Sequence, residues 1–301
     1  MAGLLELLAS RARDSPDVVA AAVDGGDELT YLSWERRSNA LGRGLEGRGV
    51  SRGQRIVVCF ATRHWVEYAI ACAGVAKVGA VAVPVSADRS GFDRASIVEH
   101  CGATLSITAS DLAGLTDGQA DTPLGPVSAA EAVEIAYPPG HLRPPRPAAR
   151  SEKEVLEALA RLRGDCVLHA FAVGGDAARS ALWAPLAPGG PTVVVLGALD
   201  PERLCAVSTE RAVDTWWLAP AAALFVAESG ALDRHDLSSL RRVELGAPRP
   251  PAAMISRLTA AFAGVGAKLV TDGVPAGPPP EQPPAGPPPA GPVKLPEHGA
   301  S

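Results

Sequence analysis

Few residues of this sequence combine the types and spacing that covalent or metal chemistry requires. The histidines His64, His100 and His235 lie in polar, surface-like contexts, and no Ser–His–Asp or Cys–His arrangement has recognisable spacing. No two cysteines form a C-x-x-C pair, so they predict neither a disulfide framework nor a zinc site, and a reducing compartment fits them best. They are Cys59, Cys72, Cys101, Cys166 and Cys205.

Composition indicates a folded protein with little affinity for polyanions. The 301 residues are 47% hydrophobic and 20% charged, close to the average for globular proteins. Lys+Arg 28 against Asp+Glu 33 gives a net charge of −5, without the broad positive field that nucleic-acid binding needs. No apolar run approaches the length of a membrane span. The N-terminus has the pattern of a short amphipathic helix without a basic leader, so we expect a cytoplasmic protein with no nucleic-acid or membrane partner.

The first third of the chain alternates short apolar runs with helical patterns. Strands are predicted at 18–23, 56–60, 81–85 and 105–108, and helices at 34–45, 64–77 and 92–101. Ser33 is a predicted helix cap, and Gly79 and Gly102 follow the ends of two helices. This alternation is typical of buried parallel strands and predicts the α/β class.

A second alternating block follows a stretch rich in Pro, Gly and Ala. Ser151 to Glu154 has the pattern of a capping box, and helices are also predicted at 200–207 and 251–262. Strands are predicted near 166–171, 192–196, 215–218, 242–245 and 268–270. We therefore expect an α/β unit over 1–108, a Pro/Ala/Gly-rich segment over 109–150, a second α/β unit over 151–274 and a Pro-rich disordered tail over 275–301.

Several stretches carry a resemblance to a known family. They are Leu29–Arg43 (LTYLSWERRSNALGR), Gly49–Val58 (GVSRGQRIVV), Gly79–Val85 (GAVAVPV), Leu168–Phe171 (LHAF), Leu186–Val195, Asp236–Arg241 (DLSSLR) and Gly246–Pro248. In this order and spacing the chain resembles the large N-terminal domain of the adenylate-forming (ANL) superfamily. That superfamily comprises acyl- and aryl-CoA ligases, peptide-synthetase adenylation domains and luciferases. The resemblance implies an α/β fold with two β/α subdomains.

The resemblance also implies a reaction and the groups that perform it. The family activates a carboxylate with Mg·ATP, forms an acyl-adenylate and passes the acyl group to a thiol. It uses a Gly-rich Thr/Ser loop, a Thr-Glu pair, a ribose-binding Asp, and a Lys from a small C-terminal domain. After Thr271 this sequence holds only the Pro-rich segment, so we expect an incomplete domain without the C-terminal small domain.

The position of the family's phosphate loop is occupied by residues 136–148. Only Tyr137, Gly140 and Pro145 match, and Arg146 stands in the Lys position. Phosphate loops use backbone N–H groups and hydroxyls, but this stretch has no Ser or Thr, and its prolines lack N–H groups. Arg143, Arg146 and Arg150 could still attract an anion through charge alone, or form a solvated basic turn.

The position of the Thr-Glu pair is occupied by Thr271-Asp-Gly-Val-Pro-Ala-Gly. Neither register leaves a hydroxyl and a carboxylate at the pair. Asp272 is a candidate Mg²⁺ ligand, with a turn residue as the alternative. Gly246, Ala247 and Pro248 resemble the lead-in to the family's adenine-binding turn, and with Gly140, Arg146 and Asp272 they complete the candidate cofactor-binding set.

The resemblance also supplies candidate residues for the acyl pocket. His169 and Phe171 match the family's acyl-pocket motif, with a core histidine as the alternative for His169. Trp216 and Trp217 end a strand beside that pocket, and since neighbouring strand residues face opposite ways, at most one of them lines it. We take Trp217 as the candidate, with core packing as the alternative.

Three functional hypotheses follow, and whether the chain is an enzyme stays open. The first is a non-catalytic relative that binds a carboxylate or acyl ligand, forms a homo-oligomer or pairs with a catalytic protein, with no cofactor. The second is an ATP-dependent carboxylate–CoA or AMP ligase that uses Mg·ATP and obtains its missing groups from a partner chain. The third is a gene remnant without a settled role.

Overall fold

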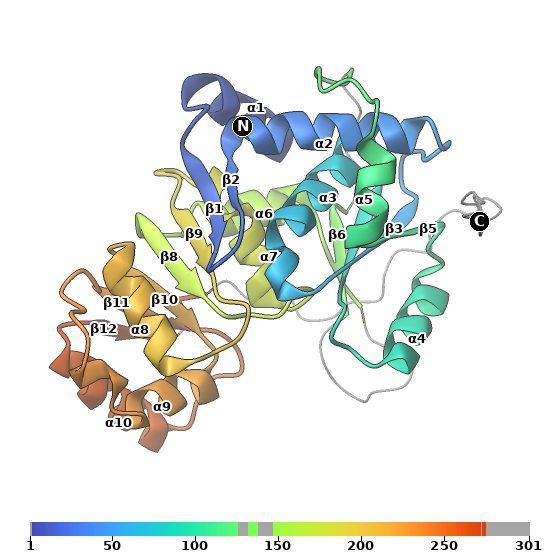
Figure 1. Cartoon of the computed structure of the whole chain (residues 1–301). Helices are drawn as coiled ribbons and strands as arrows, with labels where there is room; N and C mark the ends of the chain where they lie inside the picture. The colour runs from blue at the N-terminus through green and yellow to red at the C-terminus, as the bar shows by residue number, and fades with distance from the viewer. Residues whose placement is uncertain (1, 126–131, 138–146, 272, 275–301) are drawn as a thin grey trace, which may run out of the picture.

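Two β-sheets form the framework of the protein (Figure 1). The structure, a computed structural model, describes residues 2–125, 132–137, 147–271 and 273–274. In this part of the chain one sheet has the order β12-β11-β10-β8-β9-β1-β2 and the other β5-β3-β4-β6-β7. The first contains β1 (Val19–Val23), β2 (Glu28–Thr30), β8 (Cys166–His169), β9 (Thr192–Val195), β10 (Thr215–Leu218), β11 (Arg242–Leu245) and β12 (Lys268–Val270). The second contains β3 (Arg55–Phe60), β4 (Val81–Ser86), β5 (Leu105–Ile107), β6 (Glu134–Ala136) and β7 (Ala148–Arg150).

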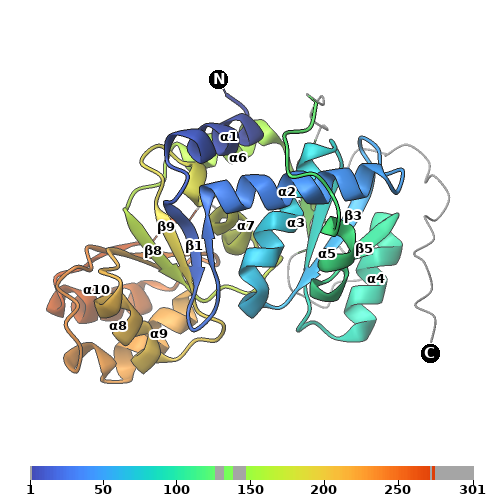
Figure 2. The same cartoon turned by 45° about the horizontal axis from the view of Figure 1, so that its top comes forward.

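The helices form three layers around the two sheets (Figures 1 and 2). The central layer shares one apolar core with both sheets and contains α1 (Leu4–Asp14), α2 (Tyr31–Glu46), α3 (Trp65–Lys77), α6 (Glu152–Leu159) and α7 (Asp176–Trp183). The outer face of the first sheet packs on α8 (Pro201–Glu210), α9 (Pro220–Glu228) and α10 (Ala252–Gly264). The second sheet is covered by α4 (Gly91–Cys101), and α5 (Ala109–Thr116) packs on α2.

Strand pairing follows the apolar runs of the sequence. Most pairs are parallel, and the antiparallel exceptions are the β1–β2 hairpin and the β6–β7 pair. β9 is a run of β-branched residues, Thr-Val-Val-Val, and its valines are fully buried. Burial on both faces explains why such strands read as continuous apolar runs. The predicted α/β class is confirmed.

The sheets divide the chain differently from the predicted units. β1 pairs with β9 through Ala21 and Val193, so the N-terminal hairpin belongs to the sheet of the second block. Conversely, β6 pairs with β4, and β7 pairs with β6, so strands from the Pro/Ala/Gly-rich segment complete the first block's sheet. Of the predicted units, the tail 275–301 lies outside the described residues.

Side-chain caps fix several helix starts. The Oγ1 of Thr30 accepts a hydrogen bond from the backbone N–H of Ser33 at 3.2 Å, so Thr30 caps α2 and the predicted cap Ser33 lies inside the helix. The predicted capping box at α6 is present, since Glu154 accepts from Ser151 N–H at 2.7 Å. Asp200 caps α8 by accepting from the Arg203 N–H at 3.1 Å. Each cap satisfies a donor that the first helical turn leaves unpaired.

Two glycines set how closely α2 approaches its neighbours. A Cβ at Gly44 would lie 1.8 Å from the carbonyl oxygen of Leu115 on α5, and one at Gly74 of α3 would lie 2.7 Å from the side chain of Leu41. Only glycine allows contacts this close. The junction of α2, α3 and α5 therefore depends on residues that carry no side chain.

Candidate functional site

A cavity of about 630 Å³ lies where the parallel strands end, and we call it the strand-end cavity. Its walls come from the loops that follow β4, β8, β10, β11 and β12, together with the first turns of α7. The lining residues are Ser86, Asp88, Arg89, Phe171, Ala172, Val173, Gly175, Asp176, Ala177, Ala178, Ala219, Gly246, Ala247, Pro248 and Val274. The volume is in the range of small-molecule sites.

The sheet topology explains this location. β8 pairs with β9 on one side and with β10 on the other, so the chain changes direction across the sheet at β8. In parallel α/β sheets the loops after the strands diverge at such a point and leave a crevice there, where ligands bind. The loop after β8 supplies Phe171, Ala172 and Val173 to the cavity, which places this wall at the switch point.

The lining is mainly apolar, with one cationic side chain. The guanidinium of Arg89 donates a hydrogen bond to the backbone carbonyl of Tyr137, which leaves further N–H donors for a ligand. Asp88 is exposed and interacts with Ser86, whereas Asp176 forms an ion pair with Arg179. The cavity therefore offers apolar walls and a single guanidinium, an arrangement that fits an organic anion.

His169 lies behind this wall. Its side chain is fully buried, its Nδ1 accepts the backbone N–H of Phe171 at 3.1 Å, and its ring centroid is 4.7 Å from that of Trp65. Burial lowers the pKa of His169 to about 3, so the imidazole is neutral near pH 7. The ring of Phe171 stacks on it at 5.4 Å. His169 thus holds the loop that carries Phe171 and does not itself line the strand-end cavity.

The two tryptophans of β10 face opposite sides of the sheet. Trp216 packs in the outer core with Phe262, whereas Trp217 joins the central core. The indole N–H of Trp217 donates to Oε2 of Glu244 at 3.0 Å, and burial raises the pKa of that carboxyl group. Neither tryptophan is among the residues that line the strand-end cavity.

A buried ion-pair network supports the edge of the cavity. Oε1 of Glu134 lies 2.6 Å from Nε of Arg150 and 3.4 Å from Nη1 of Arg179, and all three side chains are at most 2% exposed. Arg179 also pairs with Asp176, which faces the cavity. From the sequence, Arg150 was a candidate for attracting an anion. In the structure it is buried and its charge is neutralised by Glu134, so it is not free to bind a ligand.

The predicted site residues thus fall into three groups. Gly246, Ala247 and Pro248 come together with Phe171 in the strand-end cavity, although they are far from Phe171 in the sequence. His169 and Trp217 are buried beside it. Gly140, Arg146 and Asp272 lie outside the described residues, as does Arg143.

Sequence reasoning missed the polar residues after β4. Asp88 and Arg89 directly follow a buried strand, and loops at the carboxyl ends of parallel strands are where ligands bind, so this rule could have found them. In the part of the chain that the structure describes, no three His, Cys, Asp or Glu residues gather as a metal site would require. Among the same residues, no helix combines the length and apolar character needed to cross a bilayer.

Comparisons with known proteins agree with this architecture. The family model of the AMP-binding enzymes matches residues 8–141. 4-coumarate–CoA ligase 5 of Oryza sativa subsp. japonica is 27% identical over 271 residues, which cover 76% of this chain and 49% of the ligase. Gramicidin S synthase 2 of Brevibacillus brevis is 23% identical over 277 residues, 84% of this chain and 6% of the synthase. The chain thus spans about half the length of the plant ligase.

Solved structures show the same fold. The N-terminal domain of FACL13 from Mycobacterium tuberculosis superposes with a TM-score of 0.78 at 18% identity, over 89% of this chain and 75% of that one. The nonribosomal peptide synthetase FmoA3 superposes with a TM-score of 0.74 at 22% identity, over 86% of this chain and 30% of that one. The likeness to these structures is one of fold, and the similarity to the AMP-binding enzymes extends over residues 8–141.

Proposed function

We propose that this chain binds an organic carboxylate with an acyl or aryl body in the strand-end cavity and does not itself activate it with ATP. The observation that carries the proposal is the lining of that cavity, which joins an apolar wall to the guanidinium of Arg89. Phe171 and Pro248 offer contact surface for the apolar body. Arg89 offers paired donors, which match the geometry of a carboxylate.

The charges around Arg89 favour one carboxylate over a polyphosphate. Asp176 is neutralised by Arg179, whereas Asp88 remains an exposed carboxylate near the cavity. A ligand with several negative charges would be repelled by Asp88 and would have only the Arg89 guanidinium to balance its charge. The single negative charge of a monocarboxylate is balanced by Arg89 alone.

The sequence of the phosphate-loop position supports the absence of ATP chemistry. Residues 138–147 include Pro138, Pro139, Pro144 and Pro147 and no hydroxyl side chain. Each proline removes an N–H group that a phosphate-binding loop would point at an oxygen. This part of the proposal rests on sequence, since residues 138–146 lie outside the described part of the chain.

Titration calorimetry with octanoate and with trans-cinnamate tests the carboxylate site. We expect saturable binding by the unmodified protein and at least about tenfold weaker binding by Arg89→Gln, a loss of about 1.4 kcal/mol. Arg161→Gln is the matched control because Arg161 is exposed and is not among the residues that line the cavity. Equal affinities of the Arg89→Gln and control proteins would contradict the proposal.

One observation favours a second candidate function, an ATP-dependent carboxylate–thiol ligase completed by groups outside the described residues. Gly246, Ala247 and Pro248, which resemble the lead-in to the family's adenine-binding turn, line the same cavity as Phe171. An adenine ring and an acyl group would then share one crevice. ATP–pyrophosphate exchange that depends on an added carboxylate would establish this alternative.

A further inference from the structure

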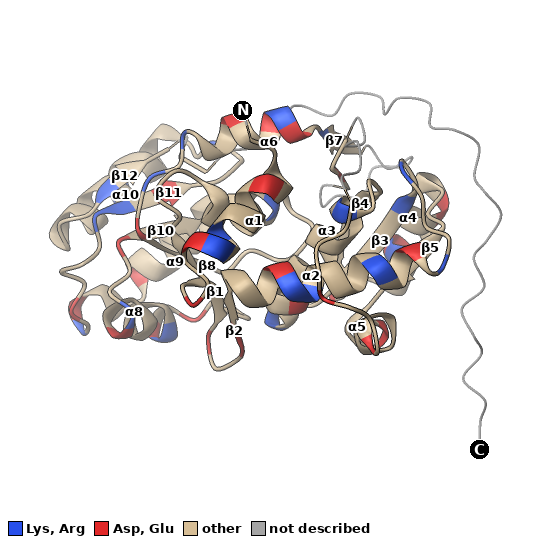
Figure 3. Ribbon diagram, turned by 90° about the horizontal axis from the view of Figure 1, so that it is seen from above, with Lys and Arg blue, Asp and Glu red and all other residues tan. Residues whose placement is uncertain are grey.

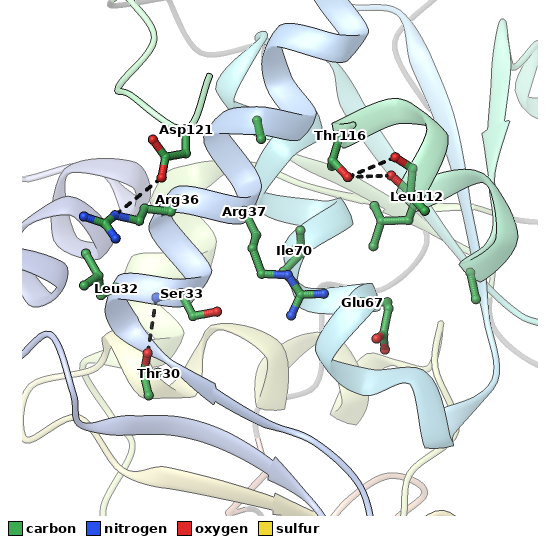
Figure 4. A pocket seen from close by; sticks show the side chains of 13 residues that line it. Thr30, Leu32, Ser33, Arg36, Arg37, Glu67, Ile70, Leu112, Thr116 and Asp121 are labelled. Atoms are coloured by element: carbon green, nitrogen blue, oxygen red, sulfur yellow. Dashed lines mark hydrogen bonds and ion pairs between the residues drawn. The ribbon is translucent and has the colours of Figure 1, made fainter. Parts of the chain in front are cut away.

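A second cavity, of about 670 Å³, lies between α2, α3 and α5, and we call it the three-helix cavity (Figure 4). It shares no lining residue with the strand-end cavity. α2 contributes Arg36, Arg37 and Ala40, among others, α3 contributes Glu67 and Ile70, and α5 contributes one face that includes Leu112. Neither the proposed carboxylate site nor the family comparison accounts for it.

The floor of this cavity is apolar and firmly packed. Ile70 is fully buried, and Ala40 and Leu112 are at most 8% exposed. The close approach of α2 to α5 at Gly44 fixes the spacing of the walls. A floor of this kind provides a preformed surface for the apolar part of a small ligand.

Two of the charged side chains on its rim pair with each other, and two others have no strong partner. Nε of Arg36 lies 3.5 Å from Oδ2 of Asp121, so these two neutralise each other. The side chain of Arg37 has no ion pair or hydrogen bond with any other residue that the structure describes. Figure 4 shows its guanidinium beside Ile70, on the side of the cavity where Glu67 lies.

Glu67 is the opposite charge without a strong partner. Its nearest ionisable partner in the described chain is the His64 ring, with Nδ1 4.0 Å from Oε2. Arg37 and Glu67 do not approach within ion-pair distance of each other, although both line the cavity. Figure 3 shows that α2 carries both signs of charge, so the rim is not part of a single-sign field.

We propose that the three-helix cavity binds an apolar amino acid. Its carboxylate would pair with Arg37, its ammonium group with Glu67, and its side chain would cover Ile70 and Leu112. A simple carboxylate would leave Glu67 unpaired, and a simple amine would leave Arg37 unpaired. The juxtaposition of two separated, opposite charges, neither of which has a strong partner, over an apolar floor therefore selects a zwitterion.

L-phenylalanine is the probe, and titration calorimetry is the measurement. We expect saturable binding at or below about 10 mM, weakened at least about tenfold by Arg37→Gln and by Glu67→Gln. Glu46→Gln is the matched control, since Glu46 is an exposed carboxylate on α2, the helix of Arg37, and does not line the cavity. Circular dichroism and thermal melting of each variant separate lost binding from lost folding.

The Arg89→Gln protein distinguishes this site from the strand-end cavity. We expect the Arg89→Gln protein to bind L-phenylalanine with unchanged affinity. It should bind 3-phenylpropanoate, which lacks the amine, and 2-phenylethylamine, which lacks the carboxylate, at least about tenfold more weakly than L-phenylalanine. Absence of saturable binding would overturn the inference. So would binding that Arg89→Gln abolishes and Arg37→Gln leaves intact, because the amino acid would then occupy the other cavity.

Discussion

The strand-end cavity and the three-helix cavity are similar in size and different in construction. The strand-end cavity, about 630 Å³, is walled by loops that emerge from parallel strands, whereas the three-helix cavity, about 670 Å³, is walled by helix faces. In the first, Asp176 is neutralised by a buried arginine and Arg89 is the cation that remains for a ligand. In the second, one charge of each sign stays without a strong partner.

Each of the two cavities depends on a different kind of support. Loops have no regular hydrogen bonding of their own, so the strand-end cavity relies on buried polar groups, the Glu134 network and His169. Helices are internally hydrogen-bonded, so the three-helix cavity relies on close packing at Gly44 and Gly74. Substitutions should therefore damage one cavity at a time.

The largest effect is expected from Glu134→Ala. It leaves the guanidinium of Arg150 buried without its carboxylate and that of Arg179 with Asp176 alone, and removing one partner of a buried ion pair destabilises by about 3–5 kcal/mol. Urea unfolding followed by circular dichroism measures the free energy of unfolding. The control Glu46→Gln should change it by less than about 0.5 kcal/mol. A loss below about 1 kcal/mol for Glu134→Ala would mean that the network does not support the fold.

The second effect concerns pH and His169. Its folded pKa of about 3 lies below the ordinary value of 6.5, so only the unfolded chain takes up this proton between the two values. The stability contributed by neutral His169 is complete above pH 6.5 and declines as pH falls toward 3. Between pH 6.5 and 5 the loss is about 2 kcal/mol.

The variant His169→Gln isolates this contribution. It removes the titrating group, so its free energy of unfolding should fall less between pH 6.5 and 5 than that of the unmodified protein. Urea denaturation at the two pH values gives the difference. Identical slopes for the two proteins would show that His169 is not held neutral in the fold.

A matched pair of glycines on α2 and α5 tests the three-helix junction. Gly44→Ala forces α5 away, because the new Cβ would meet the carbonyl oxygen of Leu115, and overpacking of this kind destabilises by about 1–3 kcal/mol. Gly114→Ala on α5 has open space around it and should be neutral or stabilising by up to about 1 kcal/mol. Thermal melting ranks the two, and octanoate binding should survive both.

The smallest effect on stability is expected at Gly246. A Cβ there would lie 3.8 Å from the ring of Phe171, an ordinary contact, so Gly246→Ala should change stability by less than about 0.5 kcal/mol. Gly246→Leu projects a larger side chain into the strand-end cavity and should weaken octanoate binding at least about tenfold. Unchanged octanoate affinity in the leucine variant would place the ligand elsewhere.

The sequence predicted the fold best where a pattern was local. The strands β10, β11 and β12 match their predicted ranges, and α3 and α4 differ from theirs by one residue at the start. The helices α5, α7 and α9 were missed. The first two are short, and α9 (Pro220–Glu228) is apolar on nearly all faces, so no periodicity marks it. The membership of β1 in the far sheet depends on its pairing with β9, which no local pattern encodes.

The candidate site was predictable only in part for the same reason. The resemblance pointed to Phe171 and to the turn at Gly246, and both line the strand-end cavity. The ion pairs of Glu134 join β6 to β7 and α7, and the uncommitted state of Arg37 depends on which neighbours three helices provide. Such relations between distant residues arise only once the chain is folded.

Titration calorimetry with Mg·ATP, alone and with octanoate present, tests whether the protein binds a carboxylate without binding nucleotide. We expect no saturable heat from nucleotide at about 1 mM, and an octanoate affinity that Mg·ATP leaves unchanged. Saturable nucleotide binding at micromolar concentration would contradict this expectation. An ATP-dependent ligase that acts in the strand-end cavity would then be the better account.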